Sequence, residues 1–164
     1  MTQDNNAAAR AELAAILDSL VSECALRTVA LVTRDGSLVT SRGDVSYLDI
    51  TALAALLGGM FSATREVAKL VGEKHFSILL QQGEKRHIHI SLVTNDFMLA
   101  LIFEDVGKIG MIRTVTRRIA GRVGELAAMD WTPSADEPAS QEPAKRSSEF
   151  REYALDLIDR IFSP

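Results

Sequence analysis

The sequence predicts an α+β domain in the order helix, two strands, helix, three strands, helix, with a five-stranded antiparallel sheet. Apolar residues recur at helical spacing in three long segments of this domain. Five short runs rich in apolar residues lie between them, bounded by turn residues. The two breaks within residues 75–104 span only four and three residues, which suits hairpins and excludes crossover helices. The strands are therefore expected to pair antiparallel.

The composition is that of one soluble globular domain with a short appendage. The chain has 164 residues, of which 47% are apolar and 24% are charged. Its net charge of −4 gives no support for general nucleic-acid binding. The single cysteine, Cys24, cannot form an internal disulfide and is expected to be a buried, unreactive thiol. Since the sequence has neither a membrane-length apolar run nor a signal-peptide pattern, we expect a protein of the reducing cytoplasm.

The first elements are expected to be a helix and a hairpin. Residues 7–22 carry one apolar helical stripe: Leu13, Ile16, Leu17 and Leu20. Strands at 26–33 and 38–41 flank Asp35-Gly36, a dipeptide that readily adopts the positive φ angles of tight turns. Asp49 then stands where the side chain that caps the next helix is expected.

This second helix, expected over 49–72, has two different faces. Bulky residues form the stripe expected to face the core, with Thr64 among them: Leu53, Leu56, Leu57, Met60, Val67 and Val71. Small residues form the opposite face: Ala52, Ala55, Gly58, Gly59, Ser62 and Ala63.

The small face predicts contact with another helix. Each glycine inside a helix costs about 1 kcal/mol relative to alanine, and close approach of a second backbone would offset that cost. The second helix would come from a second copy of the chain or from another protein. The residues expected at a dimer interface are Ala55, Gly58, Gly59, Ser62 and Ala63. The alternative is that the two glycines only kink an ordinary core helix.

Three strands and a helix complete the domain. The strands are expected at 75–81, 86–93 and 97–104, and the helix at 111–129. In the strand at 86–93, isoleucine and leucine alternate with His87, His89 and Ser91, which predicts one covered face and one exposed polar face. The strand at 97–104 is apolar on both faces, which predicts a central position in the sheet. The helix has an apolar line of Ile112, Val115, Ile119, Val123 and Leu126.

The rest of the chain is expected to be a linker and a short helix. Residues 130–148 contain three prolines among small and acidic residues, a composition typical of a disordered linker. Residues 149–164 carry apolar residues at helical spacing: Phe150, Tyr153, Leu157, Ile158, Ile161 and Phe162. The predicted organisation is a domain at 1–129, the linker, and a tethered amphipathic helix at 149–164.

Several stretches carry a family resemblance: residues 31–36, 68–73 and 110–113. On these stretches the chain resembles the roadblock/dynein light chain family over about residues 7–129. Residues 82–85, with 149–153 and 157–159 in the tail, resemble the bacterial branch whose members are partners of a small Ras-like GTPase. The second helix departs from the family pattern at Met60 and Phe61, where asparagine and alanine are frequent.

The resemblance implies a roadblock-type fold and a homodimer whose second helices lie side by side and whose sheets join edge to edge. It implies binding of a Ras-like GTPase against the paired helices, with acceleration of GTP hydrolysis, in bacterial cell polarity or motility. For the tail it implies contact with a second surface of the GTPase, which assists either nucleotide exchange or the stability of the complex. The expected GTPase-binding residues are Ser62, Arg65, Glu66, Arg117, Arg118, Phe150, Tyr153, Leu157, Ile158 and Ile161. For the tail, the alternative is docking on its own dimer.

Four arginines of the last helix stand out on an acidic protein. Helical geometry places Arg113 and Arg117 on one side of the apolar line, and Arg118 and Arg122 on the other. They could contact a GTPase, or they could form a solvated face partly balanced by Glu66 or Glu125.

The sequence offers no active site of its own. His87 and His89 share a face of one strand, but no third ligand completes a zinc site. There is no Gly-x-Ser-x-Gly elbow, and residues 107–110 are too short for a phosphate-binding loop. No catalytic, cofactor-binding or metal-binding residues are therefore expected. Two other functions are the alternatives: a non-catalytic scaffold of the same fold, and a small-ligand sensor. The sensor would need a polar-lined pocket, and the sequence shows none, so no such pocket is expected.

Overall fold

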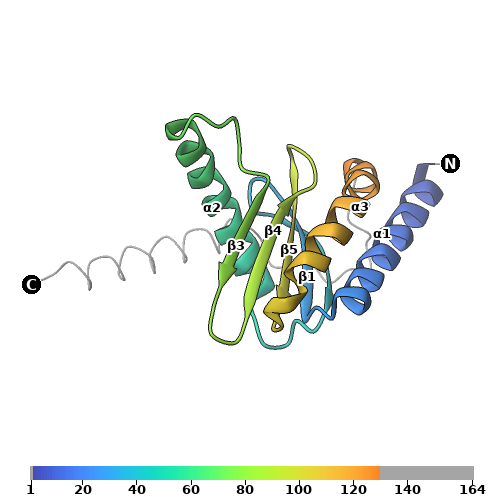
Figure 1. The fold of residues 1–164 in the computed structure, drawn as a ribbon. Helices are drawn as coiled ribbons and strands as arrows, with labels where there is room; N and C mark the ends of the chain where they lie inside the picture. The colour runs from blue at the N-terminus through green and yellow to red at the C-terminus, as the bar shows by residue number, and fades with distance from the viewer. Residues whose placement is uncertain (1, 130–164) are drawn as a thin grey trace, which may run out of the picture. The chain divides into compact units, whose positions relative to one another are not determined.

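The computed structural model describes residues 2–129, so the predicted linker and the tethered helix lie outside the described residues. The elements are α1 (Thr2–Cys24), β1 (Thr28–Thr33), β2 (Leu38–Gly43), α2 (Ile50–Leu70), β3 (Ile78–Gln82), β4 (His87–Leu92), β5 (Phe97–Phe103), the 3-10 helix η1 (Val106–Lys108) and α3 (Ile109–Ala128). Their order confirms the predicted fold class (Figure 1).

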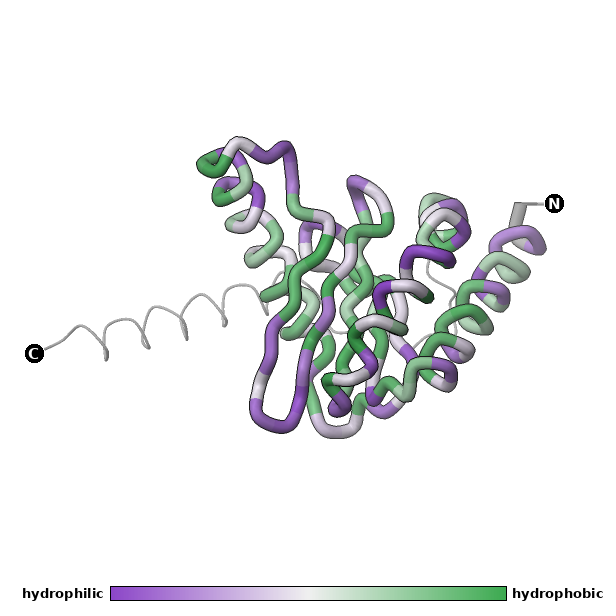
Figure 2. The backbone as a smooth tube through the Cα atoms, viewed as in Figure 1, coloured by the Kyte–Doolittle hydropathy of each residue, from purple (hydrophilic) through white to green (hydrophobic). Residues whose placement is uncertain are grey.

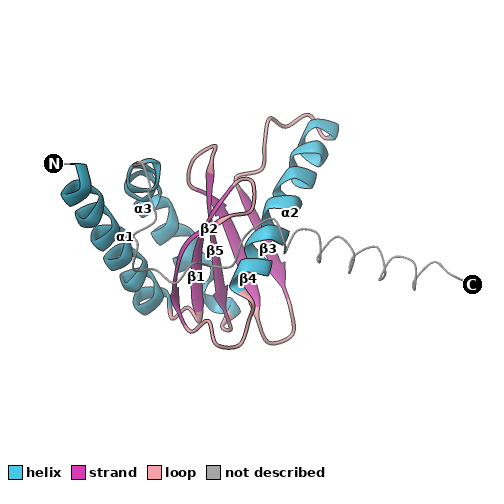
Figure 3. Ribbon diagram, turned by 180° about the vertical axis from the view of Figure 1, so that it is seen from behind, coloured by secondary structure: helices cyan, strands magenta, loops and turns pink. Residues whose placement is uncertain are grey.

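The five strands form one antiparallel sheet in the order β2-β1-β5-β4-β3. Ala100 of β5 lies opposite Ala30 of β1 and Ile90 of β4, so β5 occupies the centre as its two apolar faces predict. Helices cover both faces of the sheet: α1 and α3 lie on one face and α2 on the other (Figures 1 and 3). The strand centres are hydrophobic, whereas the β3–β4 turn is hydrophilic (Figure 2).

Each covered face has its own buried cluster. The larger one joins α1 and α3 to the sheet, and its fully buried members include Leu13, Leu17, Leu99, Leu101 and Phe103. Cys24 belongs to this cluster, which confirms the predicted buried thiol, and burial is the main reason that its pKa is raised. The smaller cluster joins α2 to Ala30, Val32, Ile90, Met98 and Ala100.

The prediction for the core face of α2 is wrong for part of its stripe. Leu57 is buried as expected, but Leu56 and Val67 are 53% and 50% exposed, and Val71, just beyond the helix, is 63% exposed. The buried residues of α2 are instead Ala54, Leu57, Gly58 and Ala68. The helix is therefore rotated about its axis relative to the expectation, and Gly58 lies against the β1–β2 turn.

The predicted exposed face of β4 is also wrong. His87 is 7% exposed, His89 is fully buried and Ser91 is 8% exposed, so this face packs under the α1–α3 layer. Ile90, on the opposite face, is buried against α2. Alternation of isoleucine and histidine indicated one covered face, but an inner strand with helices on both sides has two.

Candidate protein-binding surface

An apolar strip runs along the outer face of α2 and is here named the α2 seam: Leu56, Gly59, Ala63, Val67 and Leu70. Its members recur every three or four residues, the spacing by which one helix packs along another. Leu56, Val67 and Leu70 are 53%, 50% and 87% exposed, and Gly59 has open space around it. A continuous exposed apolar surface of this kind indicates a site for another polypeptide.

The five residues predicted at the dimer interface differ in their exposure to solvent. Ala55, Gly59, Ser62 and Ala63 are not buried on α2, whereas Gly58 is buried. The hydroxyl of Ser62 donates a hydrogen bond to the Gly58 carbonyl at 3.1 Å, so it is partly engaged within the helix. The interface itself stays a prediction for all five, since one chain is described.

Gly58 is small for a reason inside the chain. A Cβ placed on it would lie 2.6 Å from the Cα of Gly36, in the β1–β2 turn. Gly36 itself has φ +90° and has the α2 backbone about its own missing Cβ. The Asp35 carboxylate accepts hydrogen bonds from the Thr33 hydroxyl and the Ser37 N–H, and these bonds lower the pKa of Asp35. The turn is therefore well ordered where α2 rests on it.

The predicted GTPase-binding residues do not form one patch within this chain. Ser62, Arg65 and Glu66 lie on α2, whereas Arg117 and Arg118 lie on α3, on the opposite face of the sheet (Figure 3). Glu66 accepts a hydrogen bond from Lys69 at 2.8 Å. The remaining candidates lie outside the described residues: Phe150, Tyr153, Leu157, Ile158 and Ile161.

The arginines of α3 divide as the helical geometry predicts. The Arg118 guanidinium donates to both Glu23 carboxylate oxygens, at 2.9 and 3.1 Å. Arg122 donates to both oxygens of Glu12, at 2.6 Å each, and this bond lowers the pKa of Glu12. These pairs tie α3 to α1. Arg117, in contrast, is exposed and makes no ion pair within residues 2–129.

A groove of about 260 Å³ lies between α1 and α3. Apolar side chains such as Ile16, Val115 and Ile119 line it, together with Glu12, Glu23 and Arg118. The expectation that the chain lacks a pocket with polar lining is therefore wrong for this groove. Each of these charged groups is already in an ion pair, Glu23 with Arg118 and Glu12 with Arg122, so none of the three is left to bind a small charged ligand.

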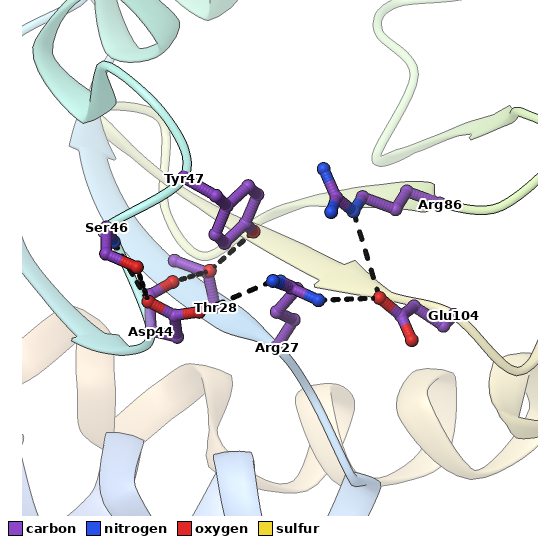
Figure 4. Close-up of polar contacts among 7 residues, drawn as sticks. All are labelled: Arg27, Thr28, Asp44, Ser46, Tyr47, Arg86 and Glu104. Carbon is purple, nitrogen blue, oxygen red and sulfur yellow. Dashed lines mark hydrogen bonds and ion pairs between the residues drawn. The ribbon is translucent and has the colours of Figure 1, made fainter.

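A cluster that no sequence pattern predicts surrounds Tyr47 at one end of the sheet (Figure 4). The guanidinium carbons of Arg27 and Arg86 lie 4.3 and 4.5 Å from the centroid of the Tyr47 ring. Both arginines also pair with Glu104, at 2.9 and 3.8 Å, and Arg27 pairs with Asp44 at 3.5 Å. No sequence signal could have found it, because its members are far apart in the chain and meet only in the fold.

His89 is a buried imidazole without a hydrogen-bond partner for either ring nitrogen within the described part of the chain. Burial, aided by the nearby positive charge of Arg113, lowers its pKa to about 4. The side chain is therefore neutral at pH 7. Residues 2–129 contain no group of three or more His, Cys, Asp or Glu residues placed to hold a metal ion. In the same residues, no helix has the length and apolar content to cross a bilayer.

Comparisons with known proteins identify the domain. Residues 12–103 match the sequence profile of the Roadblock/LC7 domain. The structure is similar to Myxococcus xanthus MglB, at 27% identity and a TM-score of 0.67, over 70% of this chain and 94% of that one. It is also similar in fold to the gliding protein MglB of Thermus thermophilus, at 24% identity and a TM-score of 0.64, over 71% of this chain and 89% of that one. The comparison with curated proteins gave no match.

Proposed function

Because this chain belongs to the Roadblock/LC7 family, we propose that it is a homodimeric regulator of a small Ras-like GTPase in bacterial cell polarity or motility. The likeness to the MglB structures supports this choice within the family. In this proposal the protein is cytoplasmic, accelerates GTP hydrolysis and assists nucleotide exchange. The catalytic groups belong to the GTPase, and this chain positions them.

The observation that carries the proposal is the α2 seam. Leu56, Val67 and Leu70 would each be removed from water by a second copy of α2. Full burial of an exposed side chain of this kind contributes about 1.5–3 kcal/mol, and the half-exposed Leu56 and Val67 would contribute about half of that. Gly59 and Ala63 between them leave room for close approach of the two helix backbones. Pairing of two copies would also place two sets of Ser62, Arg65 and Glu66 on one platform, a surface broad enough for a globular partner.

The structure favours Arg117 over Arg118 as a contact to the GTPase. Arg118 is held by the two oxygens of Glu23, so recruiting it would break an existing pair. Arg117 is exposed and makes no ion pair within residues 2–129. Since α3 and α2 lie on opposite faces of the sheet, Arg117 would have to meet a different part of the complex from the α2 platform. The apolar residues of 149–164 are a further proposed contact.

The experiment is single-turnover GTP hydrolysis by a Ras-like GTPase from the same genome, with and without this protein in excess. We expect phosphate release to speed up at least tenfold, because correct positioning of catalytic groups acts directly on the barrier. A matched assay with labelled GDP tests nucleotide exchange. Binding to the GTPase without faster phosphate release would support the scaffold function instead, and absence of binding would reject both.

A further inference from the structure

The exposed face of α2 is presented by a helix that is anchored mainly at one end. In its first half Ala54, Leu57 and Gly58 are buried, whereas among residues 59–70 only Ala68 is buried. A cavity of about 20 Å³ lies beneath the outer half, against Phe76 and β3 residues. The outer turns extend past the ends of the strands (Figures 1 and 3). The direction of α2 is therefore decided near its N-terminus.

A small change in the direction of α2 near its N-terminus produces a large displacement at its C-terminus. Gly58 rests on the β1–β2 turn and is the natural pivot. From Gly58 to Leu70 the helix extends about 18 Å, at 1.5 Å per residue. A change of about 10° in the axis direction would displace Leu70 by about 3 Å, more than half of the rise of one helical turn.

The segment that leads into α2 borders a frame of four ion-paired residues. Arg27, Asp44, Arg86 and Glu104 each stand directly beside the end of a strand, namely β1, β2, β4 and β5. All four strand ends lie at the same end of the sheet, where ion pairs among the four residues connect them (Figure 4).

Tyr47 contacts this frame through its ring, and Thr28 through its hydroxyl group. Its ring lies against both guanidinium groups, and its hydroxyl shares a hydrogen bond of 2.7 Å with the buried Thr28. Two residues later, Asp49 caps α2 by accepting a hydrogen bond from the Ala52 N–H at 3.0 Å.

We propose that Tyr47, in contact with Arg27 and Arg86, is a positioning residue that sets the direction of α2 and so orients the α2 seam. The contacts of the ring with two cations oppose tilting of the segment 44–49, because tilting would weaken one or both of these contacts. The importance of this orientation for partner binding rests on the function proposed above, but the positioning itself does not.

The test measures the direction of α2 in the full chain by electron–electron spin-label distances. Labels are attached to Lys69→Cys on α2 and Thr114→Cys on α3, both exposed positions, and Cys24 is buried away from the reagent. Dilution with unlabelled protein removes distances between copies, so the result depends on neither dimerisation nor a GTPase.

Four variants are compared with the parent. Tyr47→Ala is expected to broaden the distance distribution or shift it by about 3 Å, the displacement estimated for a 10° tilt. Tyr47→Phe keeps the ring and is expected to keep the narrow distribution, and Arg86→Gln is expected to fall between the two. Arg118→Gln breaks an ion pair on the other face of the sheet and serves as the control.

Two results would overturn the proposal. One is a Tyr47→Ala distribution equal to that of the parent, and the other is equal broadening in the Arg118→Gln control. If Tyr47→Ala does not fold, as judged by circular dichroism, Arg86→Gln decides the question, because its exposed side chain can be removed without harm to the core. Failure of the GTP hydrolysis assay would reject the proposed function and leave this measurement valid.

Discussion

The backbones of Gly58 and Gly36 are in direct contact, since a Cβ on Gly58 would lie 2.6 Å from both the Cα and the N of Gly36. This contact seats α2 on the β1–β2 turn. It also explains one of the two adjacent glycines of the helix without any second chain. The other, Gly59, has no atom within 4 Å of the position where a Cβ would stand, so contacts within the chain do not explain why this residue is a glycine.

Alanine at these two neighbouring positions is expected to have opposite effects on the free energy of unfolding. Gly58→Ala forces α2 away from the turn and should destabilise the domain by about 1–3 kcal/mol, the usual cost of overpacking. Gly59→Ala meets no atom of its own chain and, at concentrations where the protein is monomeric, should stabilise it by up to about 1 kcal/mol through better helix propensity. Urea denaturation of the two variants checks this, and a similar effect at both positions would contradict the contact.

Bulk at Gly59 is expected to prevent self-association. Gly59→Leu places a large side chain in the middle of the α2 seam, so light scattering should give the mass of a monomer where the parent gives a dimer. Gly121→Leu is the matched control, because Gly121 is also an open, exposed helical glycine but lies on α3. A Gly59→Leu protein that remains dimeric would remove the α2 seam from the interface.

The stability of the domain is expected to fall in mild acid because of His89. Its pKa is lowered from 6.5 to about 4 in the folded state, so below pH 6.5 the unfolded chain binds a proton that the folded chain does not. Stability is lost as the pH falls from about 6.5 towards 4, by about 2 kcal/mol at about pH 4.5.

Replacement of His89 by leucine should remove this loss. His89→Leu is also expected to raise stability at about pH 7.5 by about 1 kcal/mol, because it removes two buried nitrogens that lack partners among the described residues. Denaturation curves of parent and variant at several pH values give the difference. If the free energies of unfolding of the parent and His89→Leu change with pH in parallel, His89 does not titrate as its burial implies.

Substitutions of Arg117 and Arg118 are expected to change different properties: the first the acceleration of GTP hydrolysis, and the second the stability of the domain. Arg117→Glu should weaken acceleration of GTP hydrolysis at least threefold and leave the unfolding free energy unchanged. Arg118→Gln should lower stability by less than about 1 kcal/mol, since its pair with Glu23 is largely exposed, and the loss should shrink in high salt. Equal effects of both variants on hydrolysis would contradict the assignment.

The sequence predicted those features that depend on neighbouring residues. The turn at Asp35-Gly36, the Asp49 cap and the central place of β5 are confirmed, because each follows from a short segment alone. The division of the α3 arginines is confirmed as well, since helical spacing fixes it. The α2 seam was only half predicted, because small residues do not say whether a sheet or a second helix lies against them.

What could not be predicted depends on contacts between distant segments. The alternation in β4 predicts a solvent-exposed His89, because polar residues usually face water, but the α1–α3 layer covers that face of β4. The surroundings of Tyr47 come from strand ends that are separated by up to 77 positions, such as Arg27 and Glu104. The periodicity of residues within one helix or strand carries no information on contacts between distant segments.

The place of β1 in the sheet has a consequence for biosynthesis. Ala30 pairs with Ala100, which is made 70 positions later. At the usual 5–20 residues per second, the hairpin of β1 and β2 waits roughly 4–14 s on the ribosome with one edge open and its apolar residues uncovered. Such an edge can join other nascent chains. Expression yield should therefore depend on chaperones that shield the first third of the polypeptide.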